Sequence, residues 1–202
     1  MPARLLVLFV GIIAVFSLSA CGNPFAVNAT AQNIDDTLVV YALSEAPLNA
    51  PTALNTFIPV AVRTDPSQNY DLVFDIRPDS TGTPTAYVLP PRAVANTASA
   101  GIIRDSTQAF EDIKQAPVNG YNDSTIVPIK KGDVLIVQSQ SFACTQELVT
   151  ARQFIYSKIV IDSINFTPYD AFTNPDGSTI RLRIRVDPNC GFISFLDGLP
   201  TF

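Results

Sequence analysis

The chain contains no histidine and no tryptophan, and its single methionine is Met1. Histidine is the side chain most used for proton transfer near neutral pH and the commonest ligand of transition metals. Its absence excludes Ser-His-Asp and Cys-His catalysis as well as histidine-bound zinc sites. Among enzymes, the class that we still consider is a metal-free hydrolase that uses Asp and Glu.

Charged residues are also scarce, since they make up 15% of the chain against 47% apolar residues. The formal charge is −5, from 13 basic and 18 acidic residues, and removal of Arg4 with an export signal would make it −6 (−5 − 1). A nucleic-acid-binding domain needs a basic face to neutralise phosphates. The acidic balance therefore argues against a nucleic-acid partner and against electrostatic attachment to anionic lipid.

The first 21 residues have the organisation of an export signal. Arg4 provides a basic start, residues 5–16 are apolar, and small or apolar residues precede Cys21. The apolar run of about 12 residues is short for a helix that crosses a bilayer, which needs about 20. Residues 18–21, Leu-Ser-Ala-Cys, resemble the lipobox of bacterial lipoproteins. The resemblance implies cleavage of residues 1–20 and acylation of Cys21, which makes membrane lipid the expected partner.

The residues after Cys21 predict which membrane holds the protein and how the domain is connected to it. Gly22 stands where an aspartate would be expected for retention in the inner membrane, so the outer membrane is favoured. Residues 21–34 lack a lasting period and are predicted to form a flexible tether. Residues 35–202 are then expected to form a single β domain.

Cys144 and Cys190 remain once Cys21 is lipidated. In an oxidising compartment such an even pair predicts a disulfide, and the alternative is two separately buried thiols. A bridge that closes a loop of about 46 residues contributes about 4 kcal/mol in the chain-entropy model.

Strand patterns recur along the rest of the chain, and 16 prolines and 9 glycines separate them into short pieces. The predicted strands, rich in β-branched and aromatic residues, are 38–43, 57–63, 70–77, 85–89, 125–129, 134–139, 154–166, 179–186 and 192–195. The sequence Asn-Pro-Asp-Gly at 174–177 predicts a hairpin turn. The expected fold is all-β, an antiparallel two-sheet sandwich or a flattened barrel.

One short helix is predicted at 105–115, where Asp105 would cap the first turn and Phe110 and Ile113 share a face with Ala109. Pro117 would end it. The surrounding region, 91–124, is the longest without a predicted strand. Long connections are often binding loops, so a ligand is expected here first.

Three arginines alternate with apolar residues in the segment 181–186, which places them on one face of a strand. They are Arg181, Arg183 and Arg185. Such a row could bind carboxylates, sulfates or phosphates. The favoured alternative is a solvent-facing strand whose arginines pair with acids nearby in sequence, such as Asp162, Asp170 and Asp176.

Two carboxylates, Asp71 and Asp75, share one predicted strand. Their α-carbons would lie about 13 Å apart, whereas a glycosidase needs two carboxyl groups about 5 to 9.5 Å apart. They do not form such a pair by themselves. A partner from elsewhere, among Glu45, Glu111 and Glu147, would be required for hydrolysis.

Several short segments resemble HmuY-like lipoproteins in order and spacing: 70–75, 109–113, 116–117, 120–121, 134–139 and 155–159. The resemblance implies an all-β architecture. Members of that family that bind haem hold its iron through His or Met, and the mature chain has neither, so no ligand position carries over. We expect no cofactor and no metal.

These patterns favour a lipid-anchored, non-catalytic binding module of the bacterial envelope. Its ligand would be a glycan or an envelope protein. The rival hypothesis is a purely structural envelope lipoprotein, and the Asp/Glu hydrolase comes third.

Overall fold

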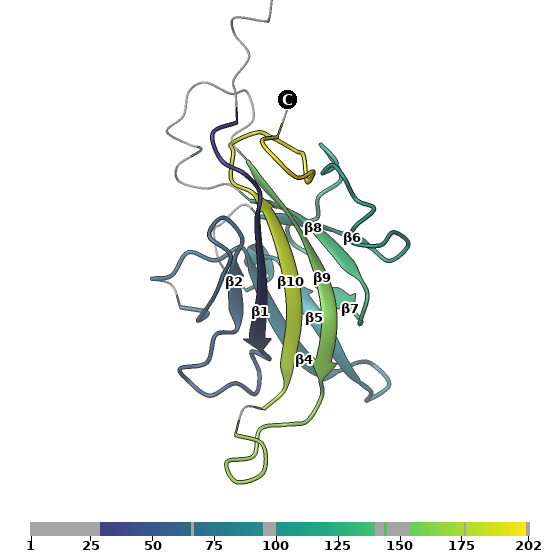
Figure 1. Ribbon diagram of the computed structural model, residues 1–202. Helices are drawn as coiled ribbons and strands as arrows, with labels where there is room; N and C mark the ends of the chain where they lie inside the picture. Colours follow the sequence, from purple (N-terminus) through teal and green to yellow (C-terminus); the bar gives the residue numbers. More distant parts are fainter. Residues whose placement is uncertain are drawn as a thin grey trace, which may run out of the picture.

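The structure is a computed structural model, and it describes residues 29–65, 67–94, 100–139, 144, 154–175 and 177–200. Two antiparallel sheets of five strands pack face to face as a sandwich (Figure 1). The predicted all-β, two-sheet fold is therefore confirmed, and the sheets do not close into a barrel. The predicted signal at 1–20, Cys21 and most of the tether lie outside the described residues.

Sheet A contains the three longest of the described strands. In spatial order its strands are β1 (Ile34–Tyr41), β10 (Thr179–Asp187), β9 (Ile155–Asn165), β8 (Val134–Ser139) and β6 (Gly101–Asp105). Sheet B contains β3 (Val60–Val62), β2 (Ala53–Asn55), β4 (Leu72–Pro78), β5 (Pro84–Leu89) and β7 (Val127–Ile129). A 3₁₀ turn, η1 (Pro91–Val94), follows β5. No helix in the described ranges is both long and apolar enough to span a membrane.

Every predicted strand except 192–195 overlaps an observed one, and β8 matches its predicted bounds at both ends. Residues 192–195 instead make an isolated bridge, between Ser194 and Gln115. The segment predicted at 57–63 is shortened to β3, because the side chain of Asn55 accepts the backbone N–H groups of Phe57 and Ile58 in a turn.

The predicted helix at 105–115 is wrong. Asp105 does accept the backbone N–H groups of Thr107 and Gln108, as a cap would, but the chain then runs through irregular turns. A helix would need the carbonyl of Phe110 to accept a backbone N–H four residues later. That carbonyl and the one of Ile113 accept hydrogen bonds from the side chain of Lys158 instead.

Two short strands were not predicted. β2 has only three residues, and β6 lies inside the region 91–124 that the sequence predicted to be a long loop. The outer edge of β6 is covered, because Ile102 and Asn122 exchange two backbone hydrogen bonds at 2.8 and 2.9 Å. The region is therefore largely built into the fold.

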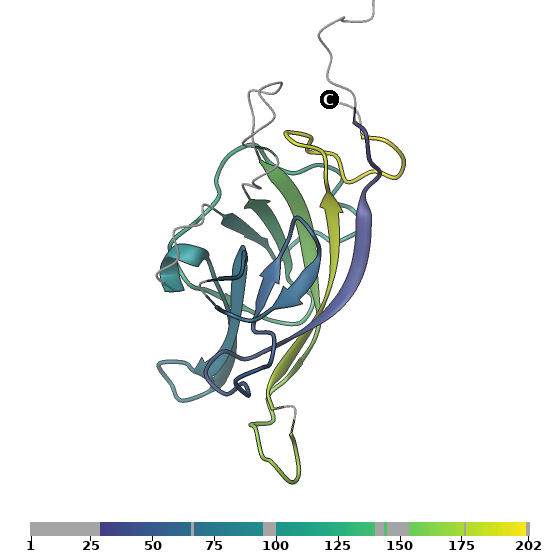
Figure 2. The same ribbon diagram turned by 90° about the vertical axis from the view of Figure 1, so that its left-hand side faces the viewer.

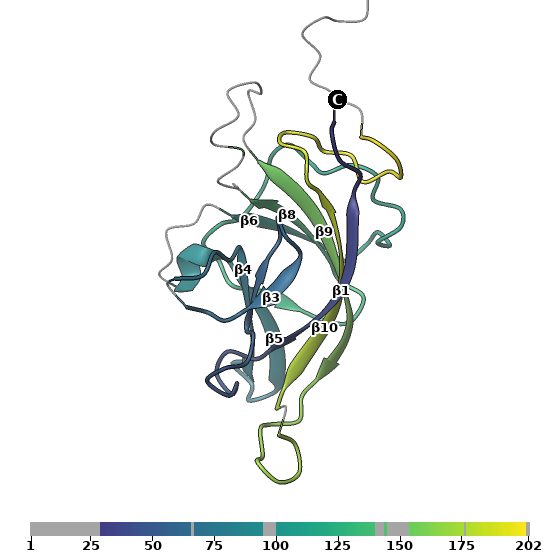
Figure 3. The same ribbon diagram turned by 60° about the vertical axis from the view of Figure 1, so that its left-hand side comes forward.

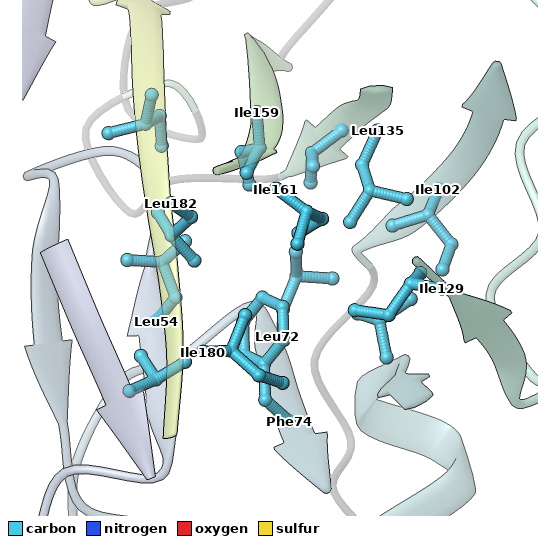
Figure 4. Packing of buried hydrophobic residues seen from close by; sticks show 14 of the residues in the cluster. Leu54, Leu72, Phe74, Ile102, Ile129, Leu135, Ile159, Ile161, Ile180 and Leu182 are labelled. Carbon is cyan, nitrogen blue, oxygen red and sulfur yellow. The ribbon is translucent and has the colours of Figure 1, made fainter. Parts of the chain in front are cut away.

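The main core fills the space between the sheets (Figure 4). Both sheets contribute apolar side chains from alternate positions, among them Leu72 and Phe74 from β4 and Ile159, Ile161 and Leu182 from sheet A. Fully burying one such side chain contributes about 1.5–3 kcal/mol. The alternation of β10, with its apolar residues inward, is thereby confirmed.

A second core covers the outer face of sheet A. Residues 106–117, which we call the cover segment, lie on it together with part of the C-terminal segment, residues 188–200. The buried members of this core are Phe110, Ile113, Ala116, Val134, Ile136, Tyr156, Val160 and Phe195. The first seven residues of β9, 155–161, are buried on both faces for this reason, and they include Ser157 and Lys158 as well as apolar residues.

The two ends of the sandwich differ. The first described residues and the C-terminal segment lie together at one end, and the connection from β9 to β10 projects from the other (Figures 1 and 2). Hydrogen bonds begin within the predicted tether range: the side chain of Asn189 accepts the backbone N–H groups of Thr30 and Ala31 at 2.8 and 3.0 Å. We call this the tether end.

The structure joins Cys144 and Cys190 in a disulfide, as predicted, with their α-carbons 5.5 Å apart. Cys190 follows β10 directly, and both cysteines belong to the main core. The bridge therefore fixes the C-terminal segment beside the tether end.

Replacing both cysteines by serine, as Cys144→Ser with Cys190→Ser, should lower the free energy of unfolding by about 2–4 kcal/mol, because the unfolded chain gains freedom. Urea denaturation of the oxidised protein and of the variant measures the difference. An identical denaturation midpoint in the two proteins would show that the bridge does not stabilise the fold.

Candidate functional site

The outer face of sheet A carries the row of arginines that the sequence singled out. β10 presents Arg181, Arg183 and Arg185 there. In the strand register Arg185 lies between Asp35 of β1 and Lys158 of β9. A row of charged residues thus crosses three neighbouring strands.

Arg185 is held by a two-pronged ion pair. Its Nε and Nη2 atoms each donate to a carboxylate oxygen of Asp35 at 2.7 Å. Its Nη1 donates to the backbone carbonyl of Phe195 at 2.9 Å and to Asp197 at 3.0 Å. The hydrogen bonds with Asp35 favour the charged guanidinium and raise the pKa of Arg185. Arg185 therefore connects β1, β10 and the C-terminal segment.

Arg183 is more exposed but also paired. Its Nε donates to both carboxylate oxygens of Asp162, at 3.1 and 3.2 Å. Its Nη1 lies 3.6 Å from Glu111 Oε1, and its guanidinium lies over the ring of Phe110. The charges of Arg183 thus contact the neighbouring strand and the cover segment.

The acidic partners are only partly those expected from sequence proximity. Asp162 pairs as predicted, whereas Asp170 accepts backbone N–H groups of its own loop, and Asp176 lies outside the described residues. Asp35 and Glu111 were not predicted as partners. They are distant in sequence, and only the pairing of β1 with β10 and the path of the cover segment bring them close.

Arg181 differs from the other two arginines. It is exposed, and no carboxylate in the described ranges lies within ion-pair distance of it. Val39, an apolar residue, is its partner on β1. The favoured prediction of a paired, solvent-facing row therefore holds for two arginines of the three.

Lys158 was not singled out by the sequence, yet it is the most deeply buried charged group of this face. It is 1% exposed. Its Nζ donates to the backbone carbonyls of Phe110 and Ile113 at 2.6 and 3.0 Å, and it lies over the rings of Phe110 and Phe195. Carbonyl dipoles and ring faces replace the water that a buried ammonium loses. Lys158 thereby fastens the cover segment to sheet A.

Burial lowers the pKa of Lys158 to about 8, and the positive charge of Arg185 acts in the same direction. Lys114 adds to this effect, while Glu111 and Asp35 oppose it. The amine is enclosed by the cover segment, so it is not placed to act on a substrate in this conformation.

A shallow groove of about 430 Å³ lies beside these charges. Its lining residues are Asp35, Asp36, Thr37, Phe110, Glu111, Arg183, Ile184 and Arg185. The volume is near the lower end of small-molecule sites, which range from about 300 to 1,000 Å³. Most of the charged groups are already paired with one another, so a ligand would have to displace these contacts.

The carboxylates of Asp71, just before β4, and Asp75, within β4, have structural partners. Asp71 accepts the backbone N–H and the hydroxyl of Thr56 at 2.7 and 2.8 Å. Burial raises the pKa of Asp71, against the effect of these hydrogen bonds. Asp75 accepts the backbone N–H and the hydroxyl of Ser44 at 3.0 and 2.7 Å. Both carboxylates thus fix connections to β4.

The glutamates considered as hydrolytic partners are also dispersed. Glu45 accepts the hydroxyl of Ser178 at 2.9 Å, Glu111 lies beside Arg183, and Glu147 falls outside the described residues. Where the chain is described, these carboxylates are not brought together as a free pair.

Asp187 is a second buried ionisable group, at the tether end of β10. Its Oδ1 accepts the backbone N–H and the side-chain amide of Asn189 at 3.0 and 2.8 Å. Burial raises the pKa of Asp187 to about 6, although these hydrogen bonds oppose the shift. Asn189 in turn holds Thr30 and Ala31, so Asp187 supports the point where the chain enters the fold.

No group of three or more acidic or cysteine side chains is arranged for a metal ion within the ranges that the structure covers. No family model, curated protein or solved structure matches the chain.

The paired Arg185 and the unpaired Arg181 allow the contribution of the ion pairs to stability to be tested with matched variants. Arg185→Gln should lower the free energy of unfolding by about 1–3 kcal/mol, because it leaves the charge-assisted hydrogen bonds of Asp35 unmade. Arg181→Gln should change it by less than about 0.5 kcal/mol, as for an isolated surface group. Equal losses in urea denaturation would contradict this division of roles.

The raised pKa of Asp187 predicts that the stability of the fold depends on pH. Its pKa rises from 3.8 to about 6 on folding, so the folded state binds the proton more tightly and stability is lost as the pH rises through this window. As the pH rises from 4 to 7, the wild type should therefore lose more free energy of unfolding than Asp187→Asn does. Parallel stability profiles for the two proteins would refute the assigned shift.

Proposed function

We propose that the protein is a lipid-anchored, non-catalytic binding domain of the bacterial envelope, held in the outer membrane through acylated Cys21. The sequence around Cys21 supports the anchor, since it resembles a lipobox after a short apolar run. The binding role draws on the fold, because a rigid sandwich that presents connecting loops is a common scaffold for recognition.

The position of Thr30, at the start of the described residues, carries the proposal. Asn189 holds Thr30 nine residues after Cys21 (30 − 21). Nine residues span at most about 30 Å when fully extended. A lipid on Cys21 would therefore keep the tether end near the membrane surface and leave the opposite end of the sandwich directed away from it.

The disulfide supports export. Bridges between residues such as Cys144 and Cys190 persist in oxidising compartments and are rare in the cytosol. A domain that is anchored outside the cytoplasm meets this condition.

The dispersed carboxylates favour binding over hydrolysis. Asp71, just before β4, is engaged by Thr56, and Asp75, within β4, is engaged by Ser44. The candidate partners are a glycan or an envelope protein, which would be bound by the exposed loops.

Cys21→Ser should abolish acylation and release the protein from the membrane fraction, because two or more acyl chains are needed for stable anchoring. Intact-mass measurement of the membrane-extracted wild type should show acyl groups on a new amino terminus at residue 21. The matched control, Cys144→Ser, removes another cysteine and should leave the acyl mass unchanged. An unacylated, soluble product from the wild-type gene would refute the proposal.

A further inference from the structure

The connection between β9 and β10, residues 166–178, projects from the end opposite the tether (Figures 1 and 2). We call it the distal loop. Its neighbour at the same end is the loop 42–50 that follows β1. The two loops are joined at their bases, because Ala42 donates its backbone N–H to the carbonyl of Ser178, and the hydroxyl of Ser178 donates to Glu45.

The backbone of the distal loop is held by many hydrogen bonds of its own. Asp170 and Asn174 exchange two backbone hydrogen bonds at 3.0 and 2.9 Å. The carboxylate of Asp170 accepts the N–H groups of Phe172 and Thr173 at 2.9 Å each. The side chain of Asn174 donates to two further carbonyls of the loop. The loop is thus preorganised around Phe172.

Gly177 closes the loop in a conformation that requires glycine. Its φ is +68°, and a Cβ added there would lie 3.2 Å from Cβ of Tyr169. Any other residue would be strained and would push against Tyr169.

This ordered loop exposes its aromatic side chains. Phe172 is 96% exposed, and Tyr169 and Phe166 are nearly half exposed. Leu48 of the neighbouring loop is 97% exposed. An exposed ring on a rigid backbone contributes little to folding, but it loses little freedom on binding, which is the property of an interface anchor.

The charged side chains within these two loops are acidic. Asp170 lies in the distal loop and Glu45 in residues 42–50, and the sequence of neither loop has a Lys or Arg. Arg63, which hydrogen-bonds Asn49, is paired with Asp65. The loops therefore lack the basic groups that attract anionic lipid headgroups. A basic surface is complementary to them.

We propose that the distal loop docks on a protein partner, inserting Phe172 into an apolar pocket whose rim carries Lys or Arg. This inference rests on the proposed binding function and names the surface that performs it. Phe172 is the anchor, Leu48 extends the contact, and the acidic side chains select a basic rim.

Site-specific crosslinking in the full-length protein, in the cells that naturally produce it, tests the docking site. A photoreactive p-benzoylphenylalanine at position 48 reports on the distal end without altering Phe172. It should form one discrete adduct with a protein. Phe172→Ser should reduce the yield at least about tenfold, as expected for an interface anchor.

Two further variants separate the anchor from general effects. Leu199→Ser changes an exposed apolar residue of the C-terminal segment and should leave the yield unchanged. Gly177→Ala keeps Phe172 but disturbs the loop, so it should lower the yield as well. The crosslinked peptide should combine apolar residues with Lys or Arg.

Adducts with lipid alone, no adduct, an acidic crosslinked peptide, or equal yields from Phe172→Ser and Leu199→Ser would each overturn the docking site. The membrane fraction of the same cells is measured in parallel. If the wild type is membrane-bound but the photoreactive protein forms no adduct, the docking site alone is refuted. If the wild type is not membrane-bound, the proposed anchoring is refuted.

Discussion

Sheet A buries its inner face and part of its outer face, and that part is covered without a helix. Residues 155–161 of its central strand β9 are buried on both sides, and the cover segment and Phe195 supply the second layer. The ammonium of Lys158 connects this layer to the sheet, since it satisfies two carbonyls of the irregular cover segment. Backbone hydrogen bonds then pair that segment with the C-terminal segment, from Ala116 to Ile193 and from Phe195 to Lys114.

The covered face determines how the two ends of the molecule differ. The C-terminal segment is held against sheet A by Arg185, Phe195 and the disulfide, and its Asn189 receives the entering chain. Seen from the side in Figure 3, β1 and the C-terminal segment meet at this end, while the hairpin of β9 and β10 extends away from it. The proposed anchor and the exposed ring of Phe172 therefore lie at opposite ends of the same strands.

Local patterns in the sequence predicted much of this fold. The strict alternation of 181–186 predicted which side of β10 faces the core, and the apolar run of β8 predicted that strand to the residue. The helix at 105–115 could not be rejected from sequence, because the competitor for its carbonyls is Lys158, more than 40 residues away. Asp35 as the partner of Arg185 depends likewise on a strand pairing across 150 residues.

Hydrogen exchange tests most directly whether Lys158 holds the second layer in place. Lys158→Met keeps the length of the side chain but leaves the carbonyls of Phe110 and Ile113 without their donor. Amides of the cover segment should then lose protection by at least about tenfold, while β4 and β5 keep theirs, and the exposed control Lys130→Met should match the wild type. Unchanged protection of the cover segment in Lys158→Met would contradict the account.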